Sequence, residues 1–357
     1  MKAMNTTIKD LCALALLCAF SVPFLSSCDA LDEAPDNRTE ITTPEKVRQL
    51  LTSAYPVQSP AVLCELSGDN LLDDNVVVPA THNAAMYKFH EEAYMWEDIE
   101  DYSTNVSDTP YQIWEAFYQG ISVCNHAIAA MQEMSGDPAN DLQLAHSWGE
   151  AHVLRAYLHF VLVSLFAEAY KDDARSSADR GVPYVTIPET VVHVDYSTSE
   201  FLHDVKTTYD LIEKDLLEGI DLIDDSKYKV PAYHFNRNAA NAFAARFYLF
   251  KRDYANSLKY ANAALGETPV LRNWKAINVN TLAAAVNDYN DETQPWNYLI
   301  QSTFSYQWRM MVSNARFAIN EGTTFKSDGK KWRVGSTLDV TCFGAGPNWS
   351  STLPAYS

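Results

Sequence analysis

The chain has 357 residues, with 27 lysine and arginine residues against 46 aspartate and glutamate residues. The resulting formal net charge of -19 argues against a nucleic-acid-binding protein, because so acidic a surface would repel phosphates. Hydrophobic residues make up 47% of the sequence, and a chain of this length can bury a substantial core as one large domain or as two.

The N-terminal segment, residues 1–27, has the layout of a secretory signal. Lys2 and Lys9 form a short positive region, and the apolar run over residues 11–24 is too short to span a bilayer comfortably. The run ends in Leu-Ser-Ser followed by Cys28, which resembles the bacterial lipoprotein box, where the chain is cut before the cysteine and the thiol is acylated. We therefore expect a lipid anchor on Cys28, since each buried methylene adds about 0.8 kcal/mol of membrane affinity. The alternative is an ordinary signal peptide with an incidental cysteine.

The segment that follows, residues 28–43, is polar and acidic, and we interpret it as a tether between the membrane and a globular body. Removal of the signal takes away two lysines and one aspartate, so the net charge moves from -19 to -20. Cys64, Cys124 and Cys342 remain in the mature chain. An odd number of thiols does not indicate a disulfide framework, and their pairing stays open, although Cys124 falls on an apolar helical face.

Residues 44–266 carry the spacing of amphipathic helices. Thr43-Pro44-Glu45 is typical of a helix start. Residues 160–166 are apolar nearly all round, so we expect that part to be buried between other helices, and residues 171–198 read as a long loop with a short extended piece. The predicted helices run from Tyr111 to the break at Gly136-Asp137-Pro138, from about Asp141 to Tyr170, from Phe201 to Ile223, from Asn236 to Lys251 and from Tyr254 to Leu265.

The last two predicted helices form a tight pair. Ala240, Ala244 and Ala261 would let the helices approach closely, and Arg252-Asp253 supplies a short turn. This unit resembles a tetratricopeptide repeat, although the earlier helices do not repeat its pattern at a clean 34-residue period. After Gly266 the chain becomes rich in proline, glycine and scattered tryptophan, and residues 267–357 read as loops, short strands and one short helix at most.

Several short motifs, taken in their order along the chain, carry a family resemblance. They are Leu31-Asp32-Glu33-x-Pro35-Asp36-x-Arg38 after the lipoprotein box, Leu-Ser-Gly-Asp-Asn at 66–70, Trp114-x-x-x-Tyr118-x-x-Ile121, Glu150-Ala151-x-x-Leu154-Arg155-Ala156, Gly181-Val182-Pro183 and Ala244-Ala245-Arg246-x-Tyr248-Leu249. This order resembles the SusD/RagB family of outer-membrane nutrient-binding lipoproteins, over about residues 22–300.

The resemblance implies a mainly α fold, in which tetratricopeptide-like helical pairs carry a loop-rich ligand-binding portion. Residues 44–266 would form the helical N-terminal domain and residues 267–357 the loop-rich C-terminal portion. The protein would bind an oligosaccharide or another nutrient without cleaving it. It would deliver this ligand to a SusC-like TonB-dependent transporter while anchored by lipid at the outer membrane surface. Family members are longer, so we expect an abbreviated or incomplete C-terminal portion.

Two aromatic segments have the composition of a sugar-binding site, because rings suit the apolar faces of sugars, whereas carboxylates, amides and guanidinium groups suit their hydroxyls. The first segment, residues 93–105, offers Tyr94, Trp96 and Asp98, and the resemblance places a ligand-contacting loop there. Trp96 is the leading candidate for a stacking platform; the alternative is that it packs over a helix end. The predicted ligand-binding set is completed by Asn75 and, after the last helix pair, by Tyr306, Trp308 and Arg309.

Other conspicuous side chains are interpreted as structural. Trp114, Trp148 and Tyr157 lie on helical faces and are expected in the core. Arg155 and Arg246 lie on helices that read as buried, and we expect them to be structural hydrogen-bond donors.

Signals of catalysis are weak. The chain lacks the H-E-x-x-H, G-x-S-x-G and P-loop motifs, and its paired carboxylates follow from an acidic composition. His152 and His159 lie two helical turns apart, too far for one metal, and the acidic stretch from Asp69 to Asn75 matches no EF-hand loop, so a calcium ion there stays open. We predict no catalytic residue, cofactor or metal. A helical scaffold lipoprotein that binds a protein or peptide is the alternative function, and a surface hydrolase comes third.

Overall fold

The computed structural model describes residues 41–69, 73, 84–99, 108–189, 194–270, 273, 291–300, 326–327 and 330–331. The chain divides into two units, residues 1–41 and 42–357, and the described helices and strands belong to the second. The signal segment, Cys28 and almost all of the tether therefore lie outside the described residues.

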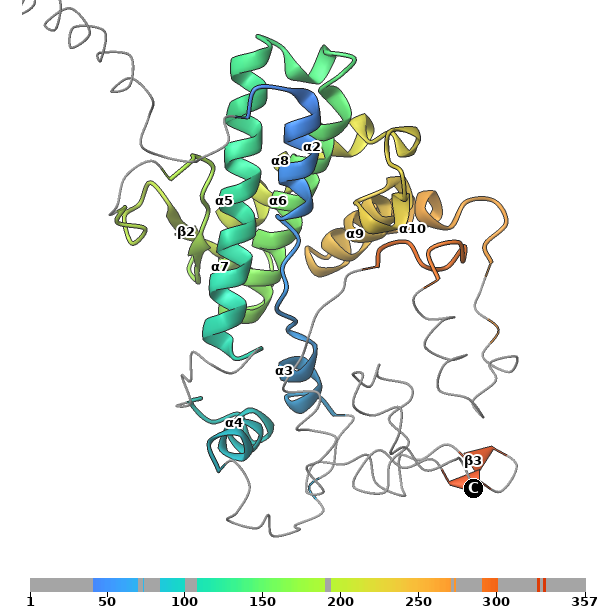
Figure 1. Ribbon diagram of the computed structural model, residues 1–357. Helices are drawn as coiled ribbons and strands as arrows, with labels where there is room; N and C mark the ends of the chain where they lie inside the picture. Colours follow the sequence, from blue (N-terminus) through green and yellow to red (C-terminus); the bar gives the residue numbers. More distant parts are fainter. Residues whose placement is uncertain are drawn as a thin grey trace, which may run out of the picture. The chain divides into compact units, whose positions relative to one another are not determined.

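The described part of the chain is mainly helical, as expected (Figure 1). The α-helices are α2 (Pro44–Thr52), α3 (Ala61–Leu66), α4 (Ala84–Met95), α5 (Pro110–Met134), α6 (Ala145–Phe166), α7 (Asp173–Ser176), α8 (Val205–Gly219), α9 (Arg237–Phe250) and α10 (Tyr254–Leu265). Short 3-10 turns are η3 (Pro138–Asn140), η4 (Ile220–Leu222), η5 (Asp225–Lys227) and η6 (Pro231–Tyr233). The strands are β1 (Arg180–Pro183), β2 (Leu202–Asp204), β3 (Lys326–Ser327) and β4 (Lys330–Lys331).

Local sequence explains where several helices begin. The hydroxyl of Thr43 accepts a hydrogen bond from the backbone N–H of Lys46 at 3.3 Å and caps α2. The side chains of Asp204, Asn236 and Asp253 cap α8, α9 and α10 in the same way. Such caps satisfy N–H groups that have no partner within the helix. The predicted start at residue 44 and the predicted final pair are thus confirmed to within a residue.

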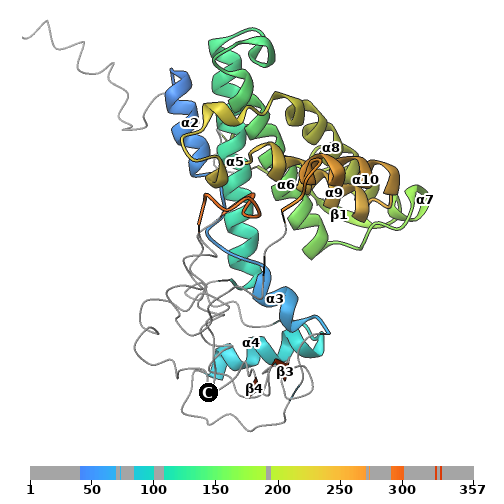
Figure 2. The ribbon, with the colours of Figure 1, turned by 90° about the vertical axis from the view of Figure 1, so that its right-hand side faces the viewer.

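The helices pack as neighbours around one core. Helix α6 packs against α5 and α8, and α9 packs against α10 (Figure 2). Large aromatic side chains fill the space between α6, α8 and α9: the ring of Phe160 lies 5.6 Å from that of Phe243, and the rings of Tyr209 and Phe247 stack at 5.7 Å. Among the expected core residues, Trp148 is 7% exposed and Cys124 is fully buried with a free thiol.

Two glycines allow α6 and α8 to touch through their backbones. A Cβ atom at Gly149 would lie 2.7 Å from the carbonyl oxygen of Gly219, and a Cβ at Gly219 would lie 2.4 Å from that of Gly149. Real side chains do not fit at such distances, so this crossing needs glycine on both helices.

Burial along α6 differs from the expectation. Every residue from His146 to Ala156 is buried, although this half contains Glu150, His152 and Arg155. The apolar end at residues 160–166 is less completely covered, with Ser164 exposed. Helix α6 as a whole is in contact with α2, α5, α8, η3 and η4, so most of its residues are buried, polar ones included.

The loop after α6 contains more regular structure than the sequence indicated. Strands β1 and β2 pair antiparallel, with Arg180 opposite Asp204 and Pro183 opposite Leu202. The backbone N–H of Tyr184 then donates to the carbonyl of Phe201 at 2.8 Å. The short strands β3 and β4 also pair antiparallel. None of the described helices combines the length and hydropathy needed to cross a membrane.

Helices α3 and α4 form a separate small cluster. Val62, Leu66, Phe89 and Ala93 bury one another, and Tyr94 packs against them. The hydroxyl of Ser67 donates to the backbone carbonyl of Ala93 at 3.1 Å and ties the two helices together. This cluster is far smaller than the main core.

Candidate functional site

The first candidate surface lies at the end of α4 and is centred on Trp96, which is 78% exposed. Its backbone has φ = 57°, the left-handed region that usually belongs to glycine. The N–H of Glu97 donates to the carbonyl of Glu92 at 2.9 Å, the bond that closes a helix end of this type. The chain thus accepts an unfavourable backbone conformation and an exposed indole at the same residue. The alternative in which Trp96 packs over the helix end does not fit this exposure.

The other sequence-predicted residues of this segment are placed differently. Asp98 is exposed two residues after Trp96, so its carboxylate is available to hydroxyl groups. Tyr94 is half-buried, and its hydroxyl accepts a hydrogen bond from the backbone N–H of Asp73 at 3.2 Å. Tyr94 therefore supports the cluster beneath Trp96, and its ring is only partly available. The remaining predicted residues, Asn75, Tyr306, Trp308 and Arg309, lie outside the described residues.

The second candidate surface is a groove of about 690 Å³ between α5 and the chain after β1. Tyr111, Trp114 and Tyr118 follow one side of α5 at spacings of three and four residues, and Tyr196 lies across from them. The rings of Trp114 and Tyr118 are 4.8 Å apart. Polar side chains on the same lining include Glu115, Gln119, Ser122 and Glu189. Aromatic faces beside hydroxyl, amide and carboxylate groups form a surface that suits an uncharged polyol.

Hydrogen bonds orient the phenols of this groove. The hydroxyl of Tyr111 donates to Glu115 at 2.6 Å, that of Tyr118 donates to the carbonyl of Pro183 at 2.8 Å, and that of Tyr196 donates to Glu189. Burial raises the pKa of Tyr118 above its usual range. Burial together with the nearby Glu189 carboxylate raises the pKa of Tyr196 to about 12. The phenols therefore stay neutral at physiological pH.

A buried polar network holds the wall of the groove in place. The Nδ2 atom of Asn125 donates to the carbonyls of Val185 and Ile187 at 3.1 and 3.2 Å. The Nε2 atom of His159 accepts from the N–H of Val185 at 3.1 Å. The hydroxyl of Tyr184 donates to Asp215 at 2.6 Å. These bonds fix the segment after β1 against α5, α6 and α8.

The centre of this network is a buried ion pair. The guanidinium of Arg155 donates two hydrogen bonds of 2.7 Å to the carboxylate of Asp215 and a third of 2.7 Å to Asn125. Burial by itself would raise the pKa of Asp215, but Arg155 and His152 outweigh it and hold that pKa below its usual range. Burial also lowers the pKa of His159 to about 3, so its imidazole is neutral. The expectation that Arg155 is a structural donor is confirmed, with a carboxylate as its main acceptor.

Three interpretations from the sequence need correction. Trp114 is only partly buried and lines the groove, because the buried stripe of α5 passes through Ile113 and Phe117. Tyr157 is partly buried and lines another cavity, described below, together with Arg246. Arg246 is exposed and makes no hydrogen bond or ion pair with any described residue. The aromatic spacing Tyr111, Trp114, Tyr118 was visible in the sequence and could have indicated the groove.

The described residues were also considered as a metal site. Among them, no group of three or more histidine, cysteine, aspartate or glutamate side chains is placed to hold a metal ion. The imidazole of His152 is bound to Asp215 at 2.9 Å, and that of His159 is bound to the backbone. Both histidines therefore have structural partners.

Comparison with known families places these surfaces in context. A family model for SusD-like proteins, described as starch-binding associating with outer membrane, matches residues 29–249. Among curated proteins, none matched the chain significantly.

Solved structures of SusD-like proteins are similar to part of this chain. A SusD-like carbohydrate binding protein from Bacteroides vulgatus is 14% identical, with a TM-score of 0.50 over 84% of this chain and 66% of that one. A SusD superfamily protein from Bacteroides fragilis is 16% identical, with a TM-score of 0.47 over 64% of this chain and 51% of the other. A laminarin binding SusD-like protein is 18% identical, with a TM-score of 0.46 over 69% and 49%. The matches thus span about half to two thirds of the length of these structures, and the first shows a common mainly helical fold.

Proposed function

The chain belongs to the SusD-like family of starch-binding proteins associated with the outer membrane, and from this premise we propose that it binds an oligosaccharide without cleaving it and delivers it to a SusC-like TonB-dependent transporter. Family membership agrees with the order of motifs in the sequence. The proposal includes a lipid anchor on Cys28 and exposure at the cell surface. It also includes the absence of catalysis, which the family supports in general terms.

The observation that carries the proposal is Trp96, which combines 78% exposure with a left-handed backbone. Residues held in unfavourable backbone conformations concentrate at functional sites, because the surrounding structure must offset their cost. An exposed indole offers a flat apolar face to a sugar ring, and the exposed carboxylates of Glu97 and Asp98 lie beside it in the chain. We propose Trp96 as the stacking platform and Asp98 as an acceptor for sugar hydroxyls. Tyr94, Asn75, Tyr306, Trp308 and Arg309 stay in the proposed ligand-binding set.

A glycan array followed by calorimetry tests this role. Trp96→Ala is expected to lower the affinity for the best neutral oligosaccharide by about ten- to a hundred-fold, because burying a large apolar side chain is worth about 1.5–3 kcal/mol. Tyr254→Ala is the matched control, since Tyr254 is 66% exposed but lies on α10. Equal affinities of wild type and Trp96→Ala would move the site elsewhere.

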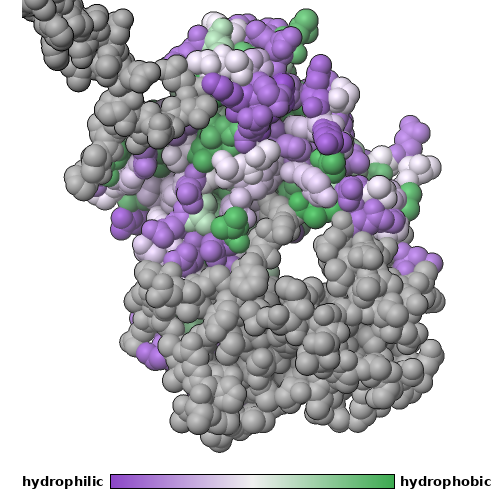
Figure 3. Space-filling view, viewed as in Figure 1, coloured by the Kyte–Doolittle hydropathy of each residue, from purple (hydrophilic) through white to green (hydrophobic). Residues whose placement is uncertain are grey.

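A specific surface favours a protein partner. Helix α10 buries only Tyr260 and Ala264, whereas Tyr254, Leu258 and Leu265 are 66%, 63% and 46% exposed. Hydrophobic patches on an otherwise hydrophilic described surface are visible in Figure 3. Exposed apolar side chains on one element are typical of protein contacts. This stripe supports docking to the transporter, and equally the alternative of a scaffold that binds a protein or peptide.

One experiment distinguishes delivery to a transporter from a scaffold function. Co-purification of a SusC-like transporter would be compared for wild type, Leu258→Asp and Trp96→Ala. Delivery predicts that Leu258→Asp loses the transporter and keeps the sugar, whereas Trp96→Ala does the reverse. A protein that retains a peptide or protein ligand but binds no glycan on the array would favour the scaffold function. Release of reducing ends from any bound glycan would favour the hydrolase.

A further inference from the structure

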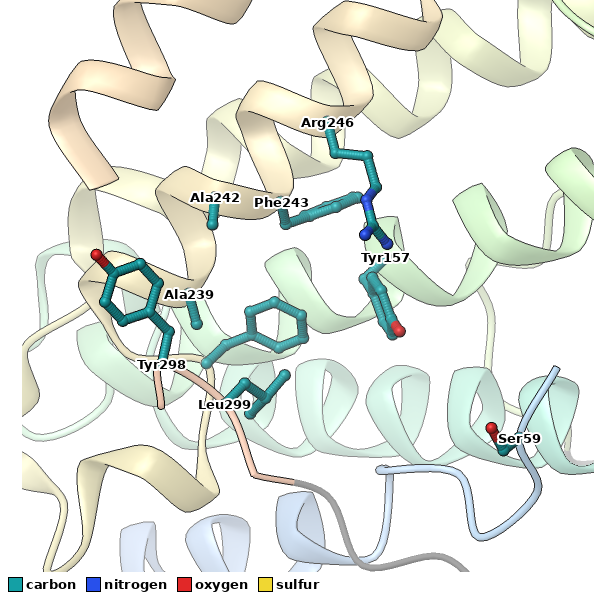
Figure 4. A pocket seen from close by; sticks show the side chains of 9 residues that line it. Ser59, Tyr157, Ala239, Ala242, Phe243, Arg246, Tyr298 and Leu299 are labelled. Atoms are coloured by element: carbon teal, nitrogen blue, oxygen red, sulfur yellow. The ribbon is translucent and has the colours of Figure 1, made fainter. Parts of the chain in front are cut away.

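A second cavity, of about 510 Å³, lies beside α9 (Figure 4). It falls within the range of about 300–1,000 Å³ typical of small-ligand sites. Ala239, Ala242, Phe243 and Arg246 line it from α9 at spacings of three and four residues, so one face of that helix forms its wall. The other lining residues are Ser59, Tyr157, Phe235, Tyr298 and Leu299.

The far wall is anchored to the helical body. The backbone N–H of Ile300 donates to the carbonyl of Ala232 at 2.7 Å. The side chain of Asn236, which caps α9, also donates to the carbonyl of Tyr298. Tyr298 and Leu299 are therefore held at the N-terminal end of α9, and the cavity is a built feature of the fold.

The floor of the cavity is aromatic. The ring of Tyr157 lies 5.3 Å from that of Phe235 and 5.4 Å from that of Phe243, and the last two rings are 6.1 Å apart. Phe235 and Phe243 are 1% and 6% exposed, so they hold the ring of Tyr157 in place, and this partly buried ring is the apolar surface that a ligand can reach. Such a surface favours a ligand with a flat or cyclic apolar face.

Two polar groups face this surface without protein partners. Arg246 is the only charged residue among those that line the cavity, and within the described part of the chain it has neither an ion pair nor a hydrogen bond. The Tyr157 hydroxyl likewise has no hydrogen-bond partner among the described residues. Figure 4 shows the guanidinium of Arg246 directed from α9 toward Tyr157 on α6. The positive charge of Arg246 acts on the Tyr157 phenol and opposes the rise of its pKa on burial.

No described carboxylate pairs with the guanidinium of Arg246, although the protein has a net charge of -19. Nearby carboxylates capture guanidinium groups elsewhere in the fold, as Asp215 does for Arg155. A planar guanidinium binds a carboxylate through two parallel hydrogen bonds, and a phenol can donate a third. The net negative charge of the protein does not prevent this, because charges farther away than about 8 Å are largely screened at physiological ionic strength.

We propose that this cavity binds the carboxylate of an acidic sugar, with Arg246 and Tyr157 as the groups that hold it and the ring of Tyr157, backed by Phe235 and Phe243, beside the sugar ring. The inference rests on the proposed function, since it names the class of saccharide. It adds a site that is separate from Trp96. A planar guanidinium presents two parallel N–H groups, which match the two oxygens of a carboxylate.

Calorimetry on the full chain tests the assignment with trigalacturonate and its methyl ester, in which each carboxylate is replaced by an uncharged methyl ester of similar shape. Wild type is expected to bind the acid at least about ten-fold more tightly than the ester, because hydrogen bonds to charged groups contribute about 1.5–3 kcal/mol. Arg246→Gln is expected to remove this difference, and Tyr157→Phe to reduce it. Arg175→Gln is the matched control, because it removes the same charge from an exposed ion pair with Asp172 on α7.

Several outcomes would overturn the inference. Equal binding of acid and ester by wild type, absence of trigalacturonate binding, or identical behaviour of Arg246→Gln and Arg175→Gln would each do so. Competition by a tripeptide with a free C-terminus, but not by its amide, would assign the cavity to peptides. The acid-to-ester ratio does not depend on Trp96, so failure here is distinguishable from failure of neutral-glycan binding in Trp96→Ala.

Discussion

The seam between α6 and α8 and the pair formed by α3 and α4 differ in how much of the fold packs around them. The seam, defined by Gly149 and Arg155 on α6 and Asp215 and Gly219 on α8, buries charged groups and gives each of them partners. The α3–α4 pair buries four apolar residues together with His90 and Glu92, and it ends in a tryptophan that is 78% exposed. The first region therefore maintains the shape of the protein, whereas the second leaves an aromatic surface free.

This difference indicates where binding and stability reside. A large core can hold a buried ion pair because packing from many elements orders both partners. A small cluster can tolerate one residue in an unfavourable backbone conformation, because few other contacts depend on that residue. Stability and ligand affinity should therefore respond to mutations in different regions.

The largest effect is expected from Arg155→Leu. The change leaves the Asp215 carboxylate buried without its guanidinium, which should lower the free energy of unfolding by about 3–5 kcal/mol in urea denaturation. Arg155→Leu combined with Asp215→Leu should recover most of this loss, because no charge is then left unpaired. A loss below about 1 kcal/mol for the single variant, the level of an ordinary surface change, would show that the seam does not depend on this pair.

Gly219→Ala tests the backbone contact of the same seam. The added methyl group would lie 2.4 Å from the carbonyl oxygen of Gly149, so the helices must move apart at a cost of about 1–3 kcal/mol. Thermal unfolding measures this loss. Gly136→Ala is the control, because nothing lies within 4 Å of a Cβ at that position. Equal stability of both variants would contradict the close crossing.

Stability should also fall on mild acidification. The pKa of His159 is lowered to about 3 in the folded protein by burial, whereas the unfolded chain binds a proton below about pH 6.5. The folded state binds fewer protons in this window, so the stabilisation is complete above about pH 6.5 and decreases as the pH falls toward 3. We expect a loss of roughly 2 kcal/mol between about pH 7 and about pH 5 in urea unfolding.

The variant His159→Gln identifies the source of this pH dependence. Glutamine does not titrate, so the variant should show a shallower decrease over the same interval. The pKa of His146 is also lowered by burial, and its contribution should persist in the variant. An unchanged slope would assign the effect to groups other than His159.

The smallest effect is expected at Trp96. Trp96→Gly should stabilise the protein by up to about 1 kcal/mol, because glycine adopts a left-handed backbone without the cost that other residues bear. The same variant should lose neutral-glycan binding. Trp96→Ala keeps the unfavourable conformation, so it should leave the unfolding free energy nearly unchanged. Clear destabilisation by Trp96→Gly would mean that the indole packs against the protein and is no platform.

The sequence predicted the fold better than the binding surfaces. The helix starts at Pro44 and Arg237 depend on residues only a few positions away, so these starts can be recognised from the sequence alone. Trp96 is exposed, and its role as a platform stays a prediction. Arg246 was assigned to the wrong environment, because the periodicity of α9 shows which residues share a face but not what stands opposite that face.

The sequence by itself determined the mainly helical class, the family and the positions of most described helices, since spacing, caps and breaks act over single turns. Only the tertiary structure decided that Trp114 and Tyr157 line cavities and that Arg155 is paired while Arg246 is free. The physical reason is that burial and ion pairing depend on groups distant in the chain: Asp215 lies sixty residues from Arg155, and no local pattern records that they meet.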